Sequence, residues 1–170
     1  MYLLLRFQPP ERLTFPQFVT ILITIMTTRL RFAVAIHILA LLAAADGQPL
    51  TSEQIAGSVR TNPVVIRRLL GCLRQSGLVE SRPGACGGWR LQRPPTRIRL
   101  DEVYRSVDGE PVLSIHTNPN PNCPIGGSLT PIIHTVFQQA QSSLESALAQ
   151  TTIAAILNEL PPISGEKAHV

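Results

Sequence analysis

The sequence predicts a mainly α-helical fold that carries one small β-hairpin and a long helix near its C-terminal end. Apolar residues recur at helical spacing through much of the 170-residue chain, which is the pattern of helices with one buried face. Start and stop signals divide the first half of the chain into short helices. Two strand-like runs flank a Pro83-Gly84 turn, which is typical of a hairpin. A chain of this length forms one main domain with a sizeable core.

Residues 1–25 show no clear periodicity, and we interpret them as an extension of the main domain. Either this extension is disordered, or the start codon was assigned too far upstream. An additional strand or helix is the alternative. Residues 15–25 are apolar but too few to span a bilayer, and no basic segment opens the chain as in a secretory signal. We therefore expect no membrane partner, and we expect the main domain to begin at Met26.

Two helices are expected first in this domain. Residues 29–47 are apolar nearly all round and end at an Asp-Gly pair, which indicates a buried central helix. Residues 50–59 form the second helix, because Thr51 and Gln54 have the spacing of a capping box.

The third helix, residues 64–77, is expected to be basic and amphipathic. Asn62 is the expected N-cap, Pro63 the first helical position and Gly77 the left-handed end. The apolar face consists of Ile66, Leu69, Leu70 and Leu73. The opposite face carries Val64, Arg67, Arg68, Gly71, Arg74 and Gln75.

The hairpin strands are expected at residues 78–82 and 87–93, so two helices joined by a short turn are followed by a hairpin. This order is that of a winged helix-turn-helix domain. We place the domain at residues 26–109, with a last short helix at residues 101–109. Trp89 is expected to pack the hairpin, which forms the wing, onto the helices.

The rest of the chain is expected to be a linker loop at residues 110–127, helices at 128–160 and a flexible tail at 161–170. DNA-binding proteins are commonly two-fold dimers, so we expect the apolar stripe of the long helix to be a homodimer interface. An intramolecular core is the alternative. The stripe residues are Ile132, Ile133, Val136, Phe137, Ala140, Leu144 and Leu148.

Charge is distributed unevenly along the chain. Residues 29–105 hold twelve arginines and five acidic residues, whereas residues 106–170 hold one lysine and five acidic residues. A GC-rich genome would also favour arginine over lysine, but it would not produce this asymmetry. The basic part indicates a surface that binds a polyanion. Helix N-termini favour phosphate oxygens, and arginines one turn inside can read guanine edges. The expected DNA contacts are Asn62, Arg67, Arg68, Arg82 and Arg90.

The run LLGCLRQSGLVESRPGACGGWRLQR (69–93), followed by IRLDEVYRSVDG (98–109), resembles the Rrf-two (Rrf2) family of bacterial winged-helix regulators, of the IscR, NsrR and CymR type. The loop NPNCPIG (120–126) resembles the YwnA-like branch of this family. The resemblance covers about residues 27–160. It implies a cytoplasmic homodimeric repressor that binds a palindromic promoter, with the long helix crossing between the subunits.

The resemblance also implies that two segments of this chain contact DNA. Base reading falls on residues 61–68 and the wing on residues 82–90. Many members have an arginine directly before the wing glycine, a position that Pro83 occupies here, so Arg82 is the nearest substitute for a minor-groove contact. The additional DNA contacts implied are Thr61, Pro63 and Val64.

The three cysteines indicate neither a disulfide scaffold nor a metal site. An odd number of unevenly spaced cysteines fits a reducing cytoplasm. Cluster-binding members of the family place three cysteines close together in the region of residues 110–127, where this chain has only Cys123, because Cys72 and Cys86 belong to the third helix and the wing. The thiolate ligands of a cluster must converge, so we expect no iron–sulfur cluster and no other cofactor.

Cys123 lies in the linker, where a chemical change could alter the spacing of the two reading helices. Two interpretations are open: a redox or electrophile switch that acts through a sulfenic acid or mixed disulfide, and a thiol that packs in a loop stiffened by prolines. The inducing signal, redox or small-molecule, is not evident from the sequence.

The sequence thus predicts a transcriptional regulator that binds double-stranded DNA. The alternative is a winged-helix protein that binds other proteins and lacks sequence-specific DNA binding, and the two differ in the salt dependence of DNA affinity. We expect no enzyme, because the chain shows no paired carboxylates, no metal-spaced histidine and cysteine cluster and no nucleophile–base arrangement.

Overall fold

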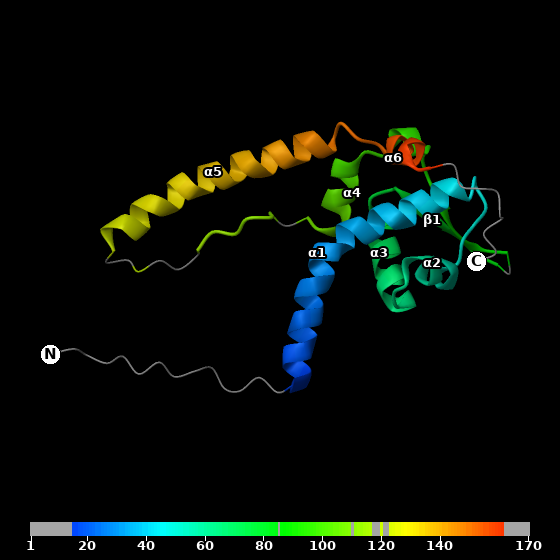
Figure 1. The fold of residues 1–170 in the computed structure, drawn as a ribbon, viewed down its shortest axis with the longest axis horizontal. Helices are drawn as coiled ribbons and strands as arrows, with labels where there is room; N and C mark the ends of the chain where they lie inside the picture. The colour runs from blue at the N-terminus through cyan, green and yellow to red at the C-terminus, as the bar shows by residue number, and fades with distance from the viewer. Residues whose placement is uncertain (1–14, 85, 110, 117–119, 121–122, 162–170) are drawn as a thin grey trace.

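The computed structural model describes residues 15–84, 86–109, 111–116, 120 and 123–161. These residues form a mostly helical fold with one two-stranded antiparallel sheet, as predicted (Figure 1). The elements are α1 (Phe15–Ala44), α2 (Ser52–Val59), α3 (Pro63–Gln75), β1 (Val79–Arg82), β2 (Gly88–Leu91), the 3-10 helix η1 (Pro95–Arg97), α4 (Leu100–Val107), α5 (Pro124–Leu148) and α6 (Ile153–Glu159).

The helix α1 begins at Phe15 and therefore includes residues 15–25, which the sequence led us to place in an extension. This run is apolar nearly all round, so it carries no periodic signal. Pro16 lies in the first turn, where the missing N–H is tolerated. In Figure 1 the second half of α1 passes α3, α4 and α6, whereas its first half projects away from them. Among the described residues, no helix combines the length and apolar character that a membrane span requires.

The helices α2 and α3 begin with the caps that the sequence predicted. Thr51 Oγ1 accepts a hydrogen bond from the Gln54 N–H at 3.2 Å. Gln54 Oε1 accepts one from the Thr51 N–H at 2.9 Å, which completes the capping box. At the start of α3, Asn62 Oδ1 accepts a hydrogen bond from the Val64 N–H at 2.8 Å, and Pro63 is the first helical residue.

Two residues with left-handed backbone set the path of the chain on either side of α3. Arg60, the C-cap of α2, has φ 56° and ψ 50°, a conformation that is uncommon outside glycine. Gly77 has φ 67° and ends α3 as predicted. The Leu78 N–H then donates to the Leu73 carbonyl at 2.9 Å, so the chain turns directly from α3 into the wing.

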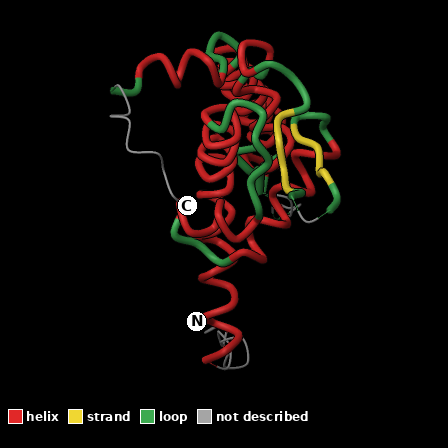
Figure 2. The backbone as a smooth tube through the Cα atoms, turned by 90° about the vertical axis from the view of Figure 1, so that its right-hand side faces the viewer, coloured by secondary structure: helices red, strands yellow, loops and turns green. Residues whose placement is uncertain are grey.

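The strands β1 and β2 form the wing and pair over their full length (Figure 2). Leu50, just before α2, adds a short antiparallel bridge to Trp89 of β2, with N···O distances of 3.0 and 2.8 Å. Gly88 permits this approach: it has φ 155°, and a Cβ there would lie 2.7 Å from the Leu50 carbonyl oxygen. The bridge attaches the wing to the start of α2.

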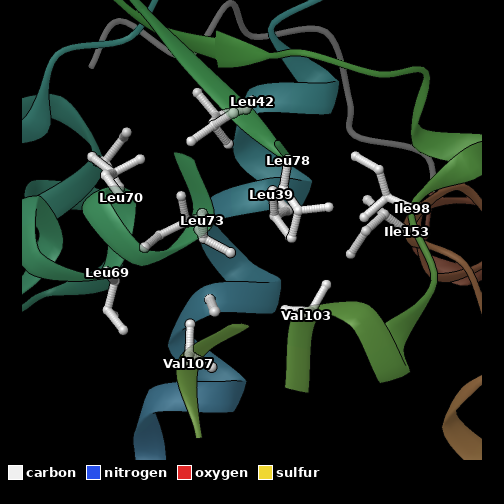
Figure 3. Packing of buried hydrophobic residues seen from close by; sticks show 14 of the residues in the cluster. Leu39, Leu42, Leu69, Leu70, Leu73, Leu78, Ile98, Val103, Val107 and Ile153 are labelled. Carbon is white, nitrogen blue, oxygen red and sulfur yellow. The ribbon is translucent and has the colours of Figure 1, made fainter. Parts of the chain in front are cut away.

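One core joins α1, α3, α4 and the end of the chain (Figure 3). Leu39 and Leu42 of α1 are buried among side chains from α3 and α4, including Leu73 and Val103. The apolar face predicted for α3 is buried as a whole, at Ile66, Leu69, Leu70 and Leu73. Because this face is buried, the opposite face of α3 is turned outward.

The helix α6 belongs to this core, whereas α5 extends away from it. Ile153 at the start of α6 is fully buried beside Ile98, and α6 packs against α1 and η1 (Figure 3). In Figure 1 only the C-terminal end of α5 lies close to α4. The helix α6 thus lies in the core of its own chain, and the expected dimerisation through residues 128–160 stays a prediction.

The helix α5 begins at Pro124, inside the segment predicted to be a loop, and its N-cap is Cys123. The sequence indicates a loop because prolines and the Gly126-Gly127 pair have low helix propensity. Proline is nevertheless favourable at the first position of a helix. Cys123 Sγ accepts a hydrogen bond from the Gly126 N–H at 3.4 Å, so the cysteine caps the helix.

Candidate nucleic-acid interface

The outer face of α3 is polar and basic. Arg67 and Arg68 both point away from the core, and the Arg67 side chain is 54% exposed. No acidic residue lies in the first turn of α3, so the partial positive charge at the helix start is not neutralised within that turn. The other residues predicted to contact DNA lie at this end of α3: Asn62 and Val64 are exposed, and Thr61 and Pro63 are partly buried.

The two wing arginines differ in their surroundings. Arg82 is exposed at the end of β1 and forms no ion pair with any residue that the structure describes. Arg90 lies directly opposite Glu80 in the sheet and donates from Nε to Glu80 Oε1 at 2.5 Å. Arg90 is therefore held by a carboxylate on the neighbouring strand, which the hairpin register could have predicted.

Of the two arginines on the outer face of α3, Arg67 forms an ion pair with a described residue and Arg68 does not. Arg67 forms an ion pair with Glu53 of α2, across fourteen residues of sequence. Arg68 has no ion pair within the described ranges. The sequence did not indicate Glu53 as part of the site, because its contact with Arg67 depends on how α2 packs against α3.

Trp89 packs the wing onto the helices, as expected. It is partly buried against the core, and the Arg74 guanidinium carbon lies 5.9 Å from the centre of its ring. A cation over a tryptophan face is attracted by the ring electrons. The wing therefore has a defined position beside α3.

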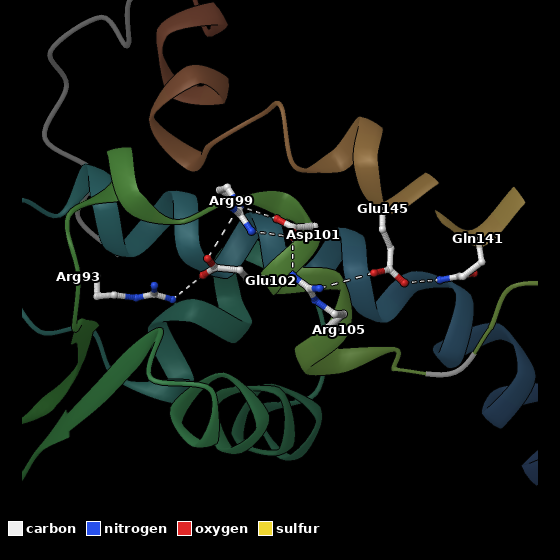
Figure 4. A network of polar contacts seen from close by, with 7 residues as sticks. All are labelled: Arg93, Arg99, Asp101, Glu102, Arg105, Gln141 and Glu145. Atoms are coloured by element: carbon white, nitrogen blue, oxygen red, sulfur yellow. Dashed lines mark hydrogen bonds and ion pairs between the residues drawn. The ribbon is translucent and has the colours of Figure 1, made fainter. Parts of the chain in front are cut away.

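Ion pairs around Asp101 connect the winged-helix part to α5 (Figure 4). Asp101 is buried and accepts two hydrogen bonds from Arg99, at 2.9 and 3.0 Å. It also accepts one from Arg105, whose Nη1 lies 3.6 Å from Glu145 Oε2 of α5. Asp101 thus joins the start of α4 to the side chain that reaches α5.

The pKa of Asp101 lies below its ordinary value. Burial raises this pKa, but hydrogen bonds and attraction from Arg99 and attraction from Arg105 outweigh the burial. A carboxyl group with a lowered pKa in the folded state stabilises the fold above its unfolded pKa of about 3.9. This stabilisation is lost as the pH falls through the lower, folded pKa.

Replacing Asp101 by asparagine is expected to lower the free energy of unfolding at pH 7 by about 2–3 kcal/mol, because two arginines lose a charged acceptor. The difference between variant and wild type is expected to shrink as the pH falls through the lowered pKa of folded Asp101, because the wild-type carboxyl is then protonated as well. Urea unfolding followed by Trp89 fluorescence, at one protein concentration, measures both values. The exposed Glu159→Gln variant is the control. Equal stability of Asp101→Asn and wild type at pH 7 would contradict this role.

The apolar stripe of α5 is divided between solvent and the rest of the chain. Ile132 and Val136 are 62% and 56% exposed, and Ala140 is exposed too. At the other end of the helix, Leu148 packs against the core of its own chain. The remaining stripe residues, Ile133, Phe137 and Leu144, are partly buried.

A hollow of about 800 Å³ lies beside α5, between α4 and residues 111–115. Gln138 and Ser142 of α5 are among its lining residues. Helical spacing places them on the side of α5 away from Ile132 and Val136. One side of α5 therefore faces its own chain, and the part of the apolar stripe around Ile132 and Val136 is left exposed.

Comparison with known proteins gives one consistent result. A family described as Rrf2, iron-dependent transcriptional regulator, matches residues 27–159. The HTH-type transcriptional regulator YwnA of Bacillus subtilis is 40% identical over 131 residues, which cover 76% of this chain and 96% of that protein. The HTH-type transcriptional regulator IscR of Cereibacter sphaeroides is 27% identical over 81% of this chain and 90% of that protein.

Solved structures resemble this fold as well. A crystal structure described as that of a DNA-binding protein has a TM-score of 0.62 and 37% identity, over 75% of this chain and 99% of that chain. CymR, the global cysteine regulator of Bacillus subtilis, has a TM-score of 0.59 over 77% of this chain and 95% of that chain, at 22% identity. The second likeness supports the winged-helix fold alone.

The cysteines of this chain do not fit the iron that the family description mentions. Cys72 lies on α3, Cys86 in the wing and Cys123 at the start of α5, so the three thiols belong to separate elements. Within the described parts of the chain, no three or more His, Cys, Asp or Glu side chains are placed to hold a metal ion. We therefore assign no step to iron in this chain.

Proposed function

Because this chain belongs to the Rrf2 family of transcriptional regulators, we propose that it is a cytoplasmic homodimeric repressor that binds a palindromic promoter. Like its relatives, it is a transcriptional regulator and not an enzyme. The observation that carries the proposal is the exposed basic face of α3, whose start is capped by Asn62, together with an arginine-bearing wing that packs against the same helix.

In this proposal α3 enters the major groove and the wing follows the backbone. Arg67 and Arg68 lie one turn inside α3, at the distance from the helix start from which side chains reach base edges. Val64 is 49% exposed on the same end and offers an apolar contact for a thymine methyl group. Arg82 and Arg90 contact phosphates or the minor groove. These contacts give the protein one half-site per subunit.

The second subunit covers the exposed side of α5. A long helix with few contacts to its own chain is marginally stable in water, and the exposed Ile132 and Val136 lose contact with water when two copies pack together. Two-fold symmetry of the protein then requires a palindromic operator, with the long helix crossing between the subunits.

Selection of genomic DNA fragments bound by the purified protein tests the proposed function. We expect the bound fragments to share an inverted repeat near a promoter, and transcription in vitro from that promoter to fall when protein is added. Affinity is expected to decrease steeply between about 50 and 200 mM salt, since phosphate contacts release counterions. Fragments with no shared inverted repeat would contradict the proposal, and so would an affinity independent of salt.

We also propose that Cys123 makes the regulator responsive to oxidants. Its sulfur lies at the first turn of α5, where partial positive charge gathers. Attack of the thiolate on hydrogen peroxide gives a sulfenic acid and hydroxide, and a small thiol can then form a mixed disulfide with release of water. Either product changes the sulfur that accepts the hydrogen bond at the start of α5. In this proposal α5 sets the spacing of the two subunits.

The Cys123→Ser variant is expected to bind the selected operator like wild type, because a serine hydroxyl also caps a helix. Peroxide or a quinone is expected to weaken operator binding of wild type by about tenfold or more and to leave Cys123→Ser unchanged. Fluorescence anisotropy of a labelled operator measures both. The Cys72→Ser variant is the control and should remain sensitive. Equal sensitivity of Cys123→Ser and wild type would eliminate the switch.

A further inference from the structure

A carboxylate of α2 lies against the arginine that we place in the major groove. Glu53, in the first turn of α2, accepts a hydrogen bond from Arg67 Nη2. Both side chains are largely exposed, at 60% for Glu53 and 54% for Arg67. The Glu53 carboxylate therefore lies on the outer surface, next to the polar face of α3.

Two observations bear on the role of this ion pair. Exposed ion pairs contribute little to folding stability, and the capping box of Thr51 and Gln54 already supports the start of α2. A hydrogen bond with the backbone and a second one from Arg67 lower the pKa of Glu53 below its ordinary value, at which a glutamate is already charged at neutral pH. We therefore expect the negative charge of Glu53 to affect the binding of ligands to this surface more than the stability of the fold.

The geometry has a chemical consequence for Arg67. A guanidinium group is planar and has five N–H donors in a fixed fork. When Glu53 accepts from Nη2, the plane of the group is held and donors remain for a second acceptor. Guanine O6 and N7 accept such a pair of parallel N–H groups. A phosphate that approached the same guanidinium would come close to the Glu53 carboxylate, and the like charges would repel each other.

We propose that Glu53 determines specificity, because it orients Arg67 toward a base and weakens the contact of Arg67 with phosphates of unrelated DNA. This inference rests on the proposed DNA binding. It states how the DNA-binding surface distinguishes the operator from unrelated DNA. Glu53 acts through Arg67 and is a positioning residue.

The wing offers a matched comparison within the same chain. Glu80 and Arg90 form an ion pair of the same kind, with exposures of 40% and 41%. Arg90 lies on the wing, which we place on the sugar-phosphate backbone, and backbone contacts carry no sequence information. Removing the Glu80 charge should therefore strengthen binding to all DNA about equally, whereas removing the Glu53 charge should favour unrelated DNA.

The test uses two probes with the full-length protein: a duplex selected by wild type from a random library, and a duplex of the same length and composition with scrambled order. We expect Glu53→Gln to bind the scrambled duplex more tightly and to lower the ratio of the two affinities by about tenfold, the effect of one well-oriented base contact. We expect Glu80→Gln to keep this ratio within about twofold. Thermal unfolding by circular dichroism checks that each variant is folded.

A second pair of variants shows whether Glu53 acts through Arg67. In a protein that already carries Arg67→Ala, adding Glu53→Gln should leave the affinity ratio unchanged, since the two residues act as one unit. An unchanged ratio in the single Glu53→Gln variant would overturn the inference, and so would an equal fall with and without Arg67. A wild-type protein that prefers neither probe would instead refute the proposed function itself.

Discussion

The double substitution Arg67→Ala with Arg68→Ala is expected to abolish binding to the operator while the protein remains folded and dimeric. Each bidentate contact to a base contributes about 1–3 kcal/mol to discrimination, so the loss of both should lower operator affinity by about thirtyfold or more. Both side chains point away from the core, so the fold should not change. Titration of a labelled operator at physiological salt measures the loss, and sedimentation velocity measures the oligomeric state.

Two controls separate base reading from charge. Arg97→Ala removes an exposed arginine of η1, which packs against α6, and it should change operator affinity by less than about threefold. Arg67→Lys with Arg68→Lys keeps the charge but removes the planar fork. This variant should bind unrelated DNA like wild type and lose its preference for the operator. If the double alanine variant bound the operator as tightly as wild type, α3 would not be the reading helix.

The double substitution Ile132→Glu with Val136→Glu is expected to convert the protein to a monomer. Both positions are more exposed than buried in the single chain, so two glutamates there should not disturb its fold. In the dimer they would bring carboxylates into an apolar interface, where an unpaired charge is very unfavourable. We expect the dissociation constant of the dimer to rise by more than about a hundredfold, and binding to a two-half-site operator to fall with it.

The control for this experiment adds the same charges to the other side of the helix. Gln138 and Ser142 are exposed and line the hollow beside α4, so Gln138→Glu with Ser142→Glu should leave the dimer intact. Analytical ultracentrifugation over a range of concentrations measures both variants. A dimer that survives Ile132→Glu with Val136→Glu would place the subunit interface elsewhere.

Local signals predicted much of the fold. The capping box of Thr51 and Gln54 and the Asn62 cap join residues two or three positions apart, so their spacing in the sequence is sufficient to identify them. The left-handed residue Gly77 and the wing turn are equally local. The start of α5 was missed because the Gly-rich run after Cys123 has low helix propensity, and a cysteine is a rare cap.

The candidate site was predicted only in part. The sequence indicated the basic outer face of α3, because burial of the apolar face leaves no other place for Arg67 and Arg68. It did not indicate that Arg67 is paired with Glu53, or that Asp101 is buried between two arginines. The contact of Arg67 with Glu53 depends on how α2 packs against α3. The burial of Asp101 likewise depends on tertiary packing, although Arg105 lies only four residues away on the same helix.

The sequence by itself thus determined the caps of α2 and α3, the end of α3, the wing and the residues that face outward on α3. Hydrogen bonds within one turn and the 3.6-residue period are properties of adjacent residues, and they can be read from spacing. Only the tertiary structure decided that Glu53 pairs with Arg67, that Ile153 completes the core, and that Ile132 and Val136 of α5 are left exposed. These outcomes depend on how separate elements pack, because packing brings together residues that no local period relates.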